Sequence, residues 1–329
     1  MTMTDFKQRL HPQMLSVLEK QAEITPGAGK VHELDVAEAR RLYATGRRYW
    51  GADAPEVHEV IDSVVEGPAG RIPVRVYHPG DERPLPALVY IHGGGWVVGS
   101  IDTHDKIMRL LAIRSGAAVI GVDYRLAPEH KFPTAADECH TVITHIVEHG
   151  GDWGVDPRHI AIGGDSAGAN LAMAVALELR DTQPSRLALL LLIYGVFGLR
   201  DSSSRRLFGE RDAGLSSKDM EYYFDCYARG PEDMHDSRFN NLSADLRGLP
   251  PAFIAAASLD PLLDDSVAMH ALMEDAGVAS RLRIYEGVLH GFLHYTRILD
   301  VANEAIDDAA EAVRTHFAVA TAQTEGSQS

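Results

Sequence analysis

The stretch HIAIGGDSAGANLAMAVALEL, residues 159–179, joins an apolar strand-like run to an amphipathic helical run through a glycine-rich turn. The turn reads GDSAG, with Ser166 at its centre, and fits the pattern Gly-x-Ser-x-Gly. Between a strand and a helix this pattern predicts a nucleophile elbow, a strained turn that exposes a serine hydroxyl. An ordinary glycine-rich turn is the alternative. A base and an acid that could activate Ser166 would favour the nucleophile elbow over the ordinary turn.

Apolar runs alternate with helical stretches along most of the chain. The strand-like runs read ALVYIH, AAVIGVD, HIAIGG, LALLLLI, AFIAAAS and RLRIY. Such alternation is typical of a mostly parallel sheet that is covered by helices on both faces. Shorter alternating runs over residues 57–78, separated by glycines and a proline, indicate a hairpin at the edge of the sheet. We therefore expect an α/β fold with a mostly parallel central sheet.

Two segments depart from this alternation. Residues 1–56 read as helices, one of which begins at Asp35, with Glu38 completing a capping box, and ends near Gly46. Residues 195–245 are long, polar and partly helical, and excursions of this kind are commonly lids or binding loops. We assign both segments to a helical cap. The core is then expected over residues 57–194 and 246–318, with a flexible tail over residues 319–329.

A serine hydroxyl becomes a good nucleophile only when a base accepts its proton and an acid orients that base. Asp260 follows the run AFIAAAS, and His290 follows the run RLRIY. The order Ser, Asp, His and the placement of each residue after a strand suit one rim of a parallel sheet. Asp264 or Asp265 is an alternative acid, and His294 is an alternative base. We predict that the serine, Asp260 and His290 form a catalytic triad.

The run YIHGGGWVVGS, residues 90–100, contains three consecutive glycines. Two phosphate-binding patterns fail here, because Val98 stands at the last glycine position of G-x-G-x-x-G and Ser100 stands where a P-loop needs lysine. Glycines let backbone N–H groups approach a reacting oxygen without obstruction, and such donors stabilise the oxyanion of acyl transfer. The expected oxyanion donors are the N–H groups of Gly93, Gly94, Gly95 and, directly after the nucleophile, Ala167.

With HGGGW, YRLAPEHKFP, GDSAGAN, LDPLLDD and VLHGF in this order, the sequence resembles the hormone-sensitive-lipase-like family of α/β-hydrolase esterases. The bacterial members with the GDSAG form are the most similar, and the resemblance spans residues 60–317. It implies an α/β-hydrolase fold with a helical cap, the same triad and oxyanion loop, and hydrolysis of short acyl esters without a cofactor. Ala169 stands where many members have another glycine. Gly195 stands where a proline is common, and this second departure bears on the floor of the acyl pocket and so on the acyl-chain preference.

The resulting hypothesis is a serine carboxylesterase that hydrolyses short-chain acyl esters through an acyl-enzyme intermediate. An amidase or arylformamidase would use the same triad, and a non-catalytic receptor on the same fold would not need a complete one. An interfacial lipase is disfavoured, because no apolar segment suits a lipid surface. Each candidate for the substrate pocket is equally suited to hydrophobic packing. These candidates are Trp96, Trp50, Phe208, Tyr222 and Tyr223.

One motif raises the alternative of a zinc hydrolase. The run HIVEH, residues 145–149, fits H-x-x-E-H, which places two histidines on one face of a helix. The motif lies just before two glycines, and the sequence offers no evident third ligand. A solvated helix end accounts for the histidines equally well, because a cationic side chain suits a helix C-terminus. We therefore expect neither a metal nor another cofactor.

The composition is that of an ordinary globular protein: 329 residues, 45% hydrophobic and 24% charged. A formal net charge of −16 disfavours nucleic acid and anionic membranes as partners, because both attract positive surfaces. We expect a small-molecule ester as partner, and a homodimer stays open. Cys139 and Cys226 are too few for a disulfide scaffold. The sequence also has no apolar run that suits a secretory signal or a membrane span. Together with the two cysteines, this indicates a cytoplasmic protein.

Overall fold

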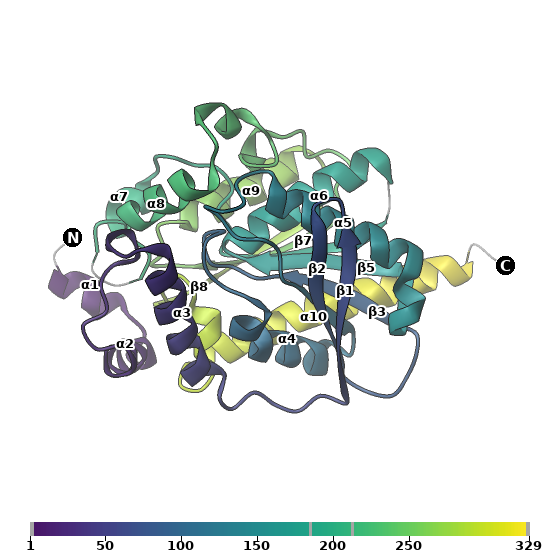
Figure 1. Cartoon of the computed structure of the whole chain (residues 1–329), viewed down its shortest axis with the longest axis horizontal. Coiled ribbons are helices and arrows are strands. Elements are labelled where there is room, and N and C mark those ends of the chain that lie inside the picture. The colour runs from purple at the N-terminus through teal and green to yellow at the C-terminus, as the bar shows by residue number, and fades with distance from the viewer. Residues whose placement is uncertain (1–2, 184–185, 212–213, 327–329) are drawn as a thin grey trace.

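A mixed eight-stranded sheet forms the centre of the molecule (Figure 1). The computed structural model describes residues 3–183, 186–211 and 214–326. The strand order is β1-β2-β4-β3-β5-β6-β7-β8. The strands are β1 (Glu59–Gly67), β2 (Gly70–His78), β3 (Leu85–Ile91), β4 (Ala118–Val122), β5 (Val155–Asp165), β6 (Leu187–Ile193), β7 (Ala252–Ala257) and β8 (Ser280–Tyr285).

The sheet is parallel from β4 to β8, and only its first two strands run against their neighbours. β1 pairs with β2 in an antiparallel hairpin, and β2 pairs antiparallel with β4. β3 is parallel to β4 and to β5, and β6, β7 and β8 continue in the same direction. The expected α/β fold, with a mostly parallel sheet and a hairpin at its edge, is confirmed. The carboxyl ends of the parallel strands therefore meet at one rim of the sheet.

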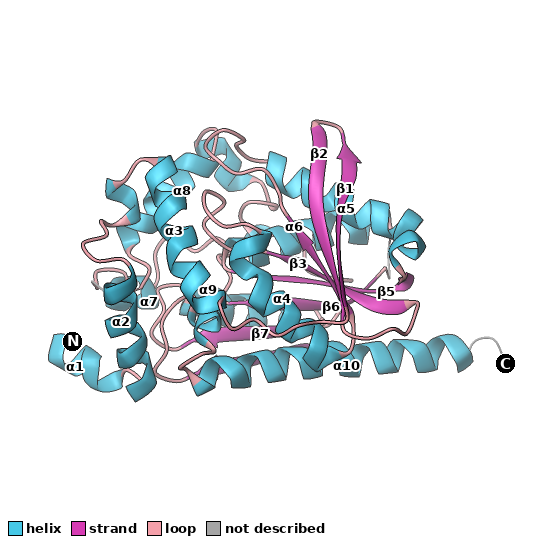
Figure 2. Cartoon of the chain, turned by 60° about the horizontal axis from the view of Figure 1, so that its bottom comes forward, coloured by secondary structure: helices cyan, strands magenta, loops and turns pink. Residues whose placement is uncertain are grey.

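Helices cover both faces of the sheet, with α4 and α10 on one face and α5, α6 and α9 on the other (Figures 1 and 2). The α-helices are α1 (Met3–Arg9), α2 (Pro12–Ile24), α3 (Val36–Gly51), α4 (Ile101–Ser115), α5 (Thr134–His149), α6 (Ala167–Thr182), α7 (Ser203–Phe208), α8 (Ser217–Tyr227), α9 (Leu263–Asp275) and α10 (Asp300–Gly326). Short 3₁₀ helices are η1 (Val31–Glu33), η2 (Gly150–Trp153), η3 (Pro231–His235), η4 (Asn241–Ser243) and η5 (Phe292–Tyr295).

Each face of the sheet has its own hydrophobic core. Along β3, Leu88 and Tyr90 belong to the core under α4 and α10, whereas Val89 and Ile91 belong to the core under α5 and α6. Side chains of a strand point alternately to opposite faces, so a strand that is buried on both faces must be apolar throughout. This explains why the runs ALVYIH and LALLLLI show no polar alternation, and it makes the sheet a rigid base for its rim.

Helix α3 begins as expected and ends later than expected. The Asp35 carboxylate accepts the Glu38 N–H at 2.8 Å, but the Glu38 side chain bonds Arg41, so the reciprocal half of the capping box is missing. The expected end near Gly46 is wrong, because the helix continues to Gly51. A Cβ at Gly46 would lie 3.1 Å from the Gln21 amide nitrogen, so this glycine permits close packing of α2 rather than a helix stop.

The two segments that we assigned to the cap contact each other. In the first segment, His32 Nδ1 lies 2.7 Å from Oδ1 of Asp219 in the second. Figure 1 shows α2, α3, α7 and α8 gathered at one end of the sheet.

At the C-terminus, α10 continues as a helix through residues 319–326, which we expected to be a flexible tail. Residues 327–329 lie outside the described part of the chain.

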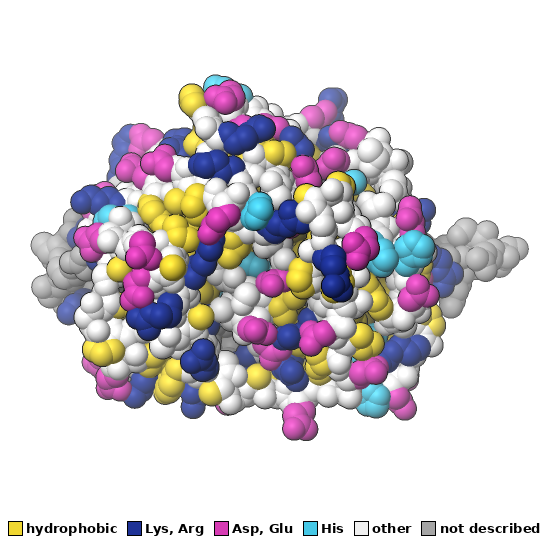
Figure 3. Space-filling view, viewed as in Figure 1, with side chains coloured by type: hydrophobic (Ala, Val, Ile, Leu, Met, Phe, Trp, Pro, Cys, Tyr) yellow, Lys and Arg dark blue, Asp and Glu magenta, His cyan; other side chains and the backbone are white. Residues whose placement is uncertain are grey.

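The surface mixes charges of both signs. On the face in Figure 3, acidic and basic side chains are interspersed, with hydrophobic side chains between them. Many of the exposed charges form local ion pairs, such as Arg41 with Glu38. Among the described helices, none combines the length and the apolar composition that crossing a membrane requires.

Candidate active site

Ser166 occupies a strained turn between β5 and α6. Its φ of +55° is unusual for a residue with a side chain. Flanking side chains could not be accommodated, because a Cβ at Gly164 or Gly168 would lie 2.2 Å or 2.0 Å from the Ile91 carbonyl oxygen. Both glycines therefore allow the turn to press against the end of β3. The predicted elbow is present, and the Ser166 side chain emerges at the rim of the sheet.

Ser166, His290 and Asp260 form a continuous hydrogen-bonded chain. Ser166 Oγ lies 2.9 Å from Nε2 of His290, and Nδ1 of His290 lies 2.7 Å from Oδ2 of Asp260. Asp260 is fully buried, and its other oxygen accepts the Leu262 N–H at 2.8 Å. This carboxylate fixes the tautomer in which Nδ1 carries the hydrogen, so Nε2 is free to accept the serine proton. The structure thus brings together the three residues that the sequence proposed.

The alternative acids and base are engaged elsewhere. Asp265 accepts three backbone N–H groups from residues 197–199, and Asp264 accepts the Ser204 N–H. Burial raises the pKa of Asp265 to about 6. The His294 ring lies edge-on to His104, with a centroid separation of 4.6 Å. None of these side chains takes part in the hydrogen-bonded chain that reaches Ser166.

Asp165, directly before the nucleophile, is a buried anchor for the glycine loop. Its Oδ1 accepts the Tyr90 hydroxyl at 2.9 Å and the Gly93 N–H at 3.1 Å. Burial opposes ionisation of Asp165, but the adjacent His104 and these donors outweigh it and hold the pKa at about 2. The expectation that Gly93 donates to an oxyanion is therefore corrected, because its N–H is already bound to a carboxylate. The sequence could not reveal the direction of this N–H.

Three other predicted donors have no acceptor within the described chain. They are the backbone N–H groups of Gly94, Gly95 and Ala167. Ala167 begins α6, where the first N–H groups of a helix lack intrahelical partners. Gly94 and Gly95 have φ values of +125° and +59°, and a Cβ at Gly95 would lie 2.3 Å from the Tyr223 ring. Glycine at these positions therefore lets the backbone take this path beside the cavity that Ser166 also lines.

Tyr124, His92 and Arg40 also hold the glycine loop in place through hydrogen bonds to its backbone carbonyl groups. The hydroxyl of Tyr124 donates to the His92 carbonyl oxygen at 2.9 Å, and the two rings stack. Burial lowers the pKa of His92 to about 3, so this imidazole is neutral and donates from Nδ1 to the Gly93 carbonyl oxygen. From helix α3, Arg40 donates to the carbonyl oxygen of Val97 at 2.8 Å. Helix α3 thus contacts the glycine loop.

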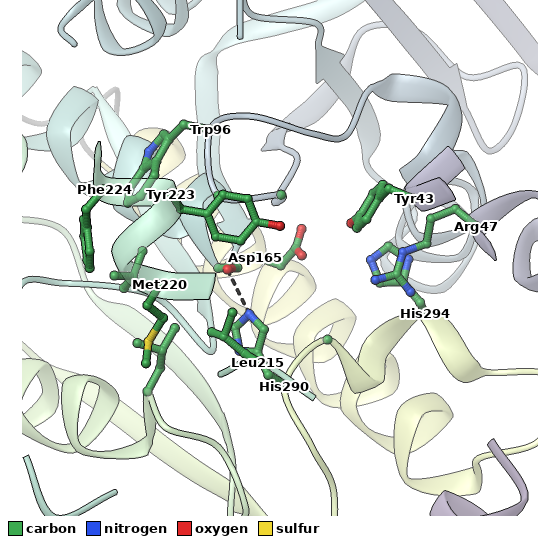
Figure 4. A pocket seen from close by; sticks show the side chains of 16 residues that line it. Tyr43, Arg47, Trp96, Asp165, Leu215, Met220, Tyr223, Phe224, His290 and His294 are labelled. Atoms are coloured by element: carbon green, nitrogen blue, oxygen red, sulfur yellow. Dashed lines mark hydrogen bonds between the residues drawn. The ribbon is translucent and has the colours of Figure 1, made fainter. Parts of the chain in front are cut away.

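A cavity of about 90 Å³ opens over Ser166 and His290 (Figure 4). Of the predicted pocket residues, Trp96 and Tyr223 line it. Trp96 also stacks on Tyr227, with a centroid separation of 4.5 Å. The cavity is apolar on the side of Trp96, Phe224 and Met220, which suits the hydrocarbon part of a small substrate.

Three of the predicted pocket residues do not line this cavity. Trp50 is buried in the cap, where its Nε1–H donates to the Gln21 side chain at 2.8 Å. Phe208 is buried against Phe6, and Tyr222 lies on α8 beside the lining residue Tyr223 but outside the lining. Trp50 and Phe208 are buried in a hydrophobic core, and Tyr222 is partly buried against one, so all three serve the packing role that the sequence left open.

Several lining residues were missed. Tyr43 and Arg47 are one turn apart on α3, and Met220 and Phe224 are one turn apart on α8. This spacing places each pair on one face of its helix. The sequence contains that signal, but it does not reveal which face of a cap helix turns toward the sheet. Leu215, Val196, Leu262 and His294 also line the cavity.

The histidines of the HIVEH run lie far from this cavity. His145 and His149 have a ring separation of 4.9 Å, and no described residue completes a three-ligand group with them. Another group does lie under the elbow, where ligand atoms of His104, Asp165 and His294 are within 4.8 Å of one another. In it, Asp165 already accepts the hydrogen bonds that anchor the glycine loop.

The fold and the relatives of the chain define a carboxylic ester hydrolase. A family described by the alpha/beta hydrolase fold matches residues 88–294, and the chain belongs to this family, in its hormone-sensitive-lipase-like branch. The chain is similar to an acetyl esterase of Salmonella choleraesuis, at 40% identity over 279 residues, which are 84% of this chain and 86% of that protein.

Solved structures give the same result. A hyperthermophilic esterase from the archaeon Pyrobaculum calidifontis superposes with a TM-score of 0.88 at 36% identity, covering 93% of this chain and 98% of that one. EstE1, a thermophilic carboxylesterase cloned from a metagenomic library, superposes with a TM-score of 0.85 at 35% identity, covering 87% and 98%. The expected family and fold are therefore confirmed.

Proposed function

We propose that Ser166, His290 and Asp260 are the catalytic triad of a carboxylesterase that acts on short acyl esters through an acyl-enzyme intermediate. The hydrogen-bonded chain from Asp260 through His290 to Ser166 carries this proposal, with separations of 2.7 Å and 2.9 Å. Its geometry is that of a base in contact with both its nucleophile and its orienting acid.

In the first half of the reaction, Ser166 Oγ attacks the ester carbonyl while Nε2 of His290 accepts the hydroxyl proton. Asp260 holds the Nδ1–H and stabilises the imidazolium that forms. Negative charge then develops on the former carbonyl oxygen, and preorganised donors can lower the barrier because they need no reorganisation. The N–H groups of Gly94, Gly95 and Ala167 serve as these donors.

In the second half, the acyl-enzyme is hydrolysed. His290 gives its proton to the alkoxide, and the alcohol leaves. Water then attacks the acyl carbonyl while His290 accepts a proton from it, and the same three N–H groups stabilise the second oxyanion. Collapse of this intermediate releases the carboxylic acid and returns the proton to Ser166.

The apolar side of the cavity favours a short acyl group. The cavity measures about 90 Å³, and its apolar side is closed by Trp96, Phe224 and Met220. A long acyl chain would have to displace these large side chains. The name of the acetyl esterase relative agrees with this inference. We propose acyl groups from acetyl to butyryl.

We also propose a cytoplasmic location, which the two free cysteines, Cys139 and Cys226, support.

Hydrolysis of p-nitrophenyl esters from acetyl to palmitoyl tests the proposal. We expect the highest kcat/KM for the short esters, and we expect Ser166→Ala to lower it by at least about 10³-fold, because the nucleophile is absent. A chelator should leave the rate unchanged. Ser166-independent turnover, or turnover that a chelator abolishes, would contradict the assignment. Preference for the palmitoyl ester would contradict the acyl range alone.

A further inference from the structure

Arg47 lies where two cavities of the protein adjoin. From helix α3 it lines the cavity over Ser166, and it also lines a larger cavity of about 380 Å³ beneath α2 and α3. Tyr43, His290 and Gly291 border both spaces as well. A substrate that extends from the first cavity into the second must therefore pass the guanidinium of Arg47.

This guanidinium has no carboxylate partner within the described chain. Its Nε is buried and lacks a hydrogen-bond partner there. Its immediate neighbours are two tyrosines: the Tyr43 ring centroid lies 4.6 Å from the guanidinium carbon, and the Tyr295 centroid lies 5.8 Å away. The side chains of both tyrosines also hydrogen-bond to the guanidinium. Cation–π contacts compensate only part of the cost of removing a charge from water. Arg47 is therefore a partly buried cation that has no counter-charge within the described chain, and its Nε still lacks an acceptor there.

The two carboxylates that line these cavities already have hydrogen-bond partners, and the larger cavity is also lined by a second cation, Lys30. Asp165 accepts hydrogen bonds from Tyr90 and Gly93. Asp219 accepts them from the Ser216 hydroxyl at 2.7 Å and lies 2.7 Å from His32 Nδ1.

The remaining ionisable neighbour, His294, is neutral. Burial, followed by the positive charge of Arg47, holds its pKa well below the usual range. The positive charge at the passage between the two cavities is therefore that of the Arg47 guanidinium. It meets an imidazole rather than a competing carboxylate at this point, and Figure 4 shows Arg47 beside His294.

The larger cavity lies on the leaving-group side. It is bordered by His290 but not by Ser166, Gly94 or Gly95, which line the first cavity. His290 must face the departing oxygen to protonate it, so the alcohol part of an ester extends toward His290. Figure 4 shows Trp96, Phe224 and Met220 on one side of His290, and Arg47 and Tyr43 on the other. The acyl group occupies the apolar side, and the alcohol part points toward Arg47.

We propose that Arg47 selects esters whose alcohol part carries a carboxylate. This inference rests on the proposed esterase function and narrows its substrate class. A guanidinium binds a carboxylate through two parallel hydrogen bonds, and such charge-assisted bonds strengthen away from bulk water. A carboxylated alcohol would supply the counter-charge that the described chain does not, whereas a neutral alcohol would leave Arg47 without one.

The test compares 4-acetoxybenzoate with its neutral analogue 4-acetoxybenzamide. Both are acetyl esters of similar size, and they differ in the charge at the far end of the alcohol. We expect the ratio of kcat/KM values, carboxylate over amide, to fall about 10-fold to 100-fold in Arg47→Gln, mainly through KM. Arg48→Gln is the matched control, because it removes the same charge from the next, exposed position of α3. Its ratio should stay at the wild-type value.

Product inhibition gives a second readout that needs no variant. We expect 4-hydroxybenzoate to inhibit hydrolysis of p-nitrophenyl acetate by the wild type at least about tenfold more strongly than 4-hydroxybenzamide. Equal inhibition by the two products would overturn the proposal. So would a ratio that changes equally in Arg47→Gln and Arg48→Gln. If the wild type showed no Ser166-dependent turnover of p-nitrophenyl acetate, the proposed function itself would fail instead.

Discussion

The N–H of Gly93 donates a hydrogen bond to Oδ1 of Asp165, 3.1 Å away. The residue before the proposed nucleophile thus anchors the loop that carries the proposed oxyanion donors. Asp165 and Gly93 are far apart in the sequence, but the parallel pairing of β3 with β5 brings the ends of both strands together. The sheet therefore fixes the position of the proposed nucleophile, Ser166, relative to the glycine loop. This relationship leads to the first of four predictions.

Asp165→Asn should lower kcat for p-nitrophenyl acetate about tenfold, with little change in KM. A neutral amide binds the Gly93 N–H and the Tyr90 hydroxyl less strongly than a carboxylate, so the loop loses part of its anchor. Steady-state kinetics on the purified variant, with circular dichroism to confirm folding, provides the check. A folded variant with a kcat within a factor of two of wild type would show that the anchor has no role in catalysis.

Arg40→Ala should reduce kcat about threefold to tenfold, because Arg40 holds the loop through the Val97 carbonyl oxygen and binds Glu129. Arg41→Ala is the matched control, since Arg41 on the same helix pairs with Glu38 at the surface. Kinetics of both variants with p-nitrophenyl acetate separates a positioning role from a general effect of charge. Equal kcat values for the two variants would exclude this role.

Gly95→Ala should lower kcat at least about 100-fold. The residue has a φ of +59°, and the new methyl group would lie 2.3 Å from the Tyr223 ring, so the loop must shift. Removing the ring by Tyr223→Ala should restore part of the lost activity, although the backbone strain remains. If the double variant is no more active than Gly95→Ala, contact with Tyr223 is not the cause.

His92 should make the protein less stable in mild acid. Its folded pKa is about 3, below the ordinary value of 6.5, so between these values only the unfolded chain binds a proton. The free energy of unfolding attributable to His92 then falls by about 1.4 kcal/mol per pH unit below pH 6.5. Urea unfolding of wild type and His92→Asn between pH 7.5 and pH 5 should show a shallower pH dependence in the variant. Parallel curves would refute this.

The sequence could predict that the three residues of the proposed triad meet, because their positions follow from the topology of the sheet. Ser166, Asp260 and His290 each follow a parallel strand, and the carboxyl ends of parallel strands share one rim. Hydrophobic runs define those strands, so residues far apart in the sequence could be placed at one site. Ala167 was placed at the site because it directly follows Ser166 in the sequence.

The remaining features of the site and the cap could not be predicted, because they depend on contacts between side chains and backbone that the sequence does not show. Gly93 was assigned to the oxyanion because the sequence does not show which way its N–H points, and Asp165 decides that. Gly46 looked like a helix end, although it serves packing between α2 and α3. Trp50 was expected in the pocket and Arg47 was not, because the rotation of a cap helix depends on the surface on which it packs.

Labelling with diethyl p-nitrophenyl phosphate tests the central claim most directly. A triad-activated Ser166 should displace p-nitrophenolate and retain the phosphoryl group, so peptide mass spectrometry should locate the adduct on Ser166 and activity should fall in proportion. Ser166→Ala should not be labelled, and His290→Ala should be labelled far more slowly. Full modification of Ser166 with undiminished hydrolysis of p-nitrophenyl acetate, or inactivation by an adduct on another residue, would contradict the account.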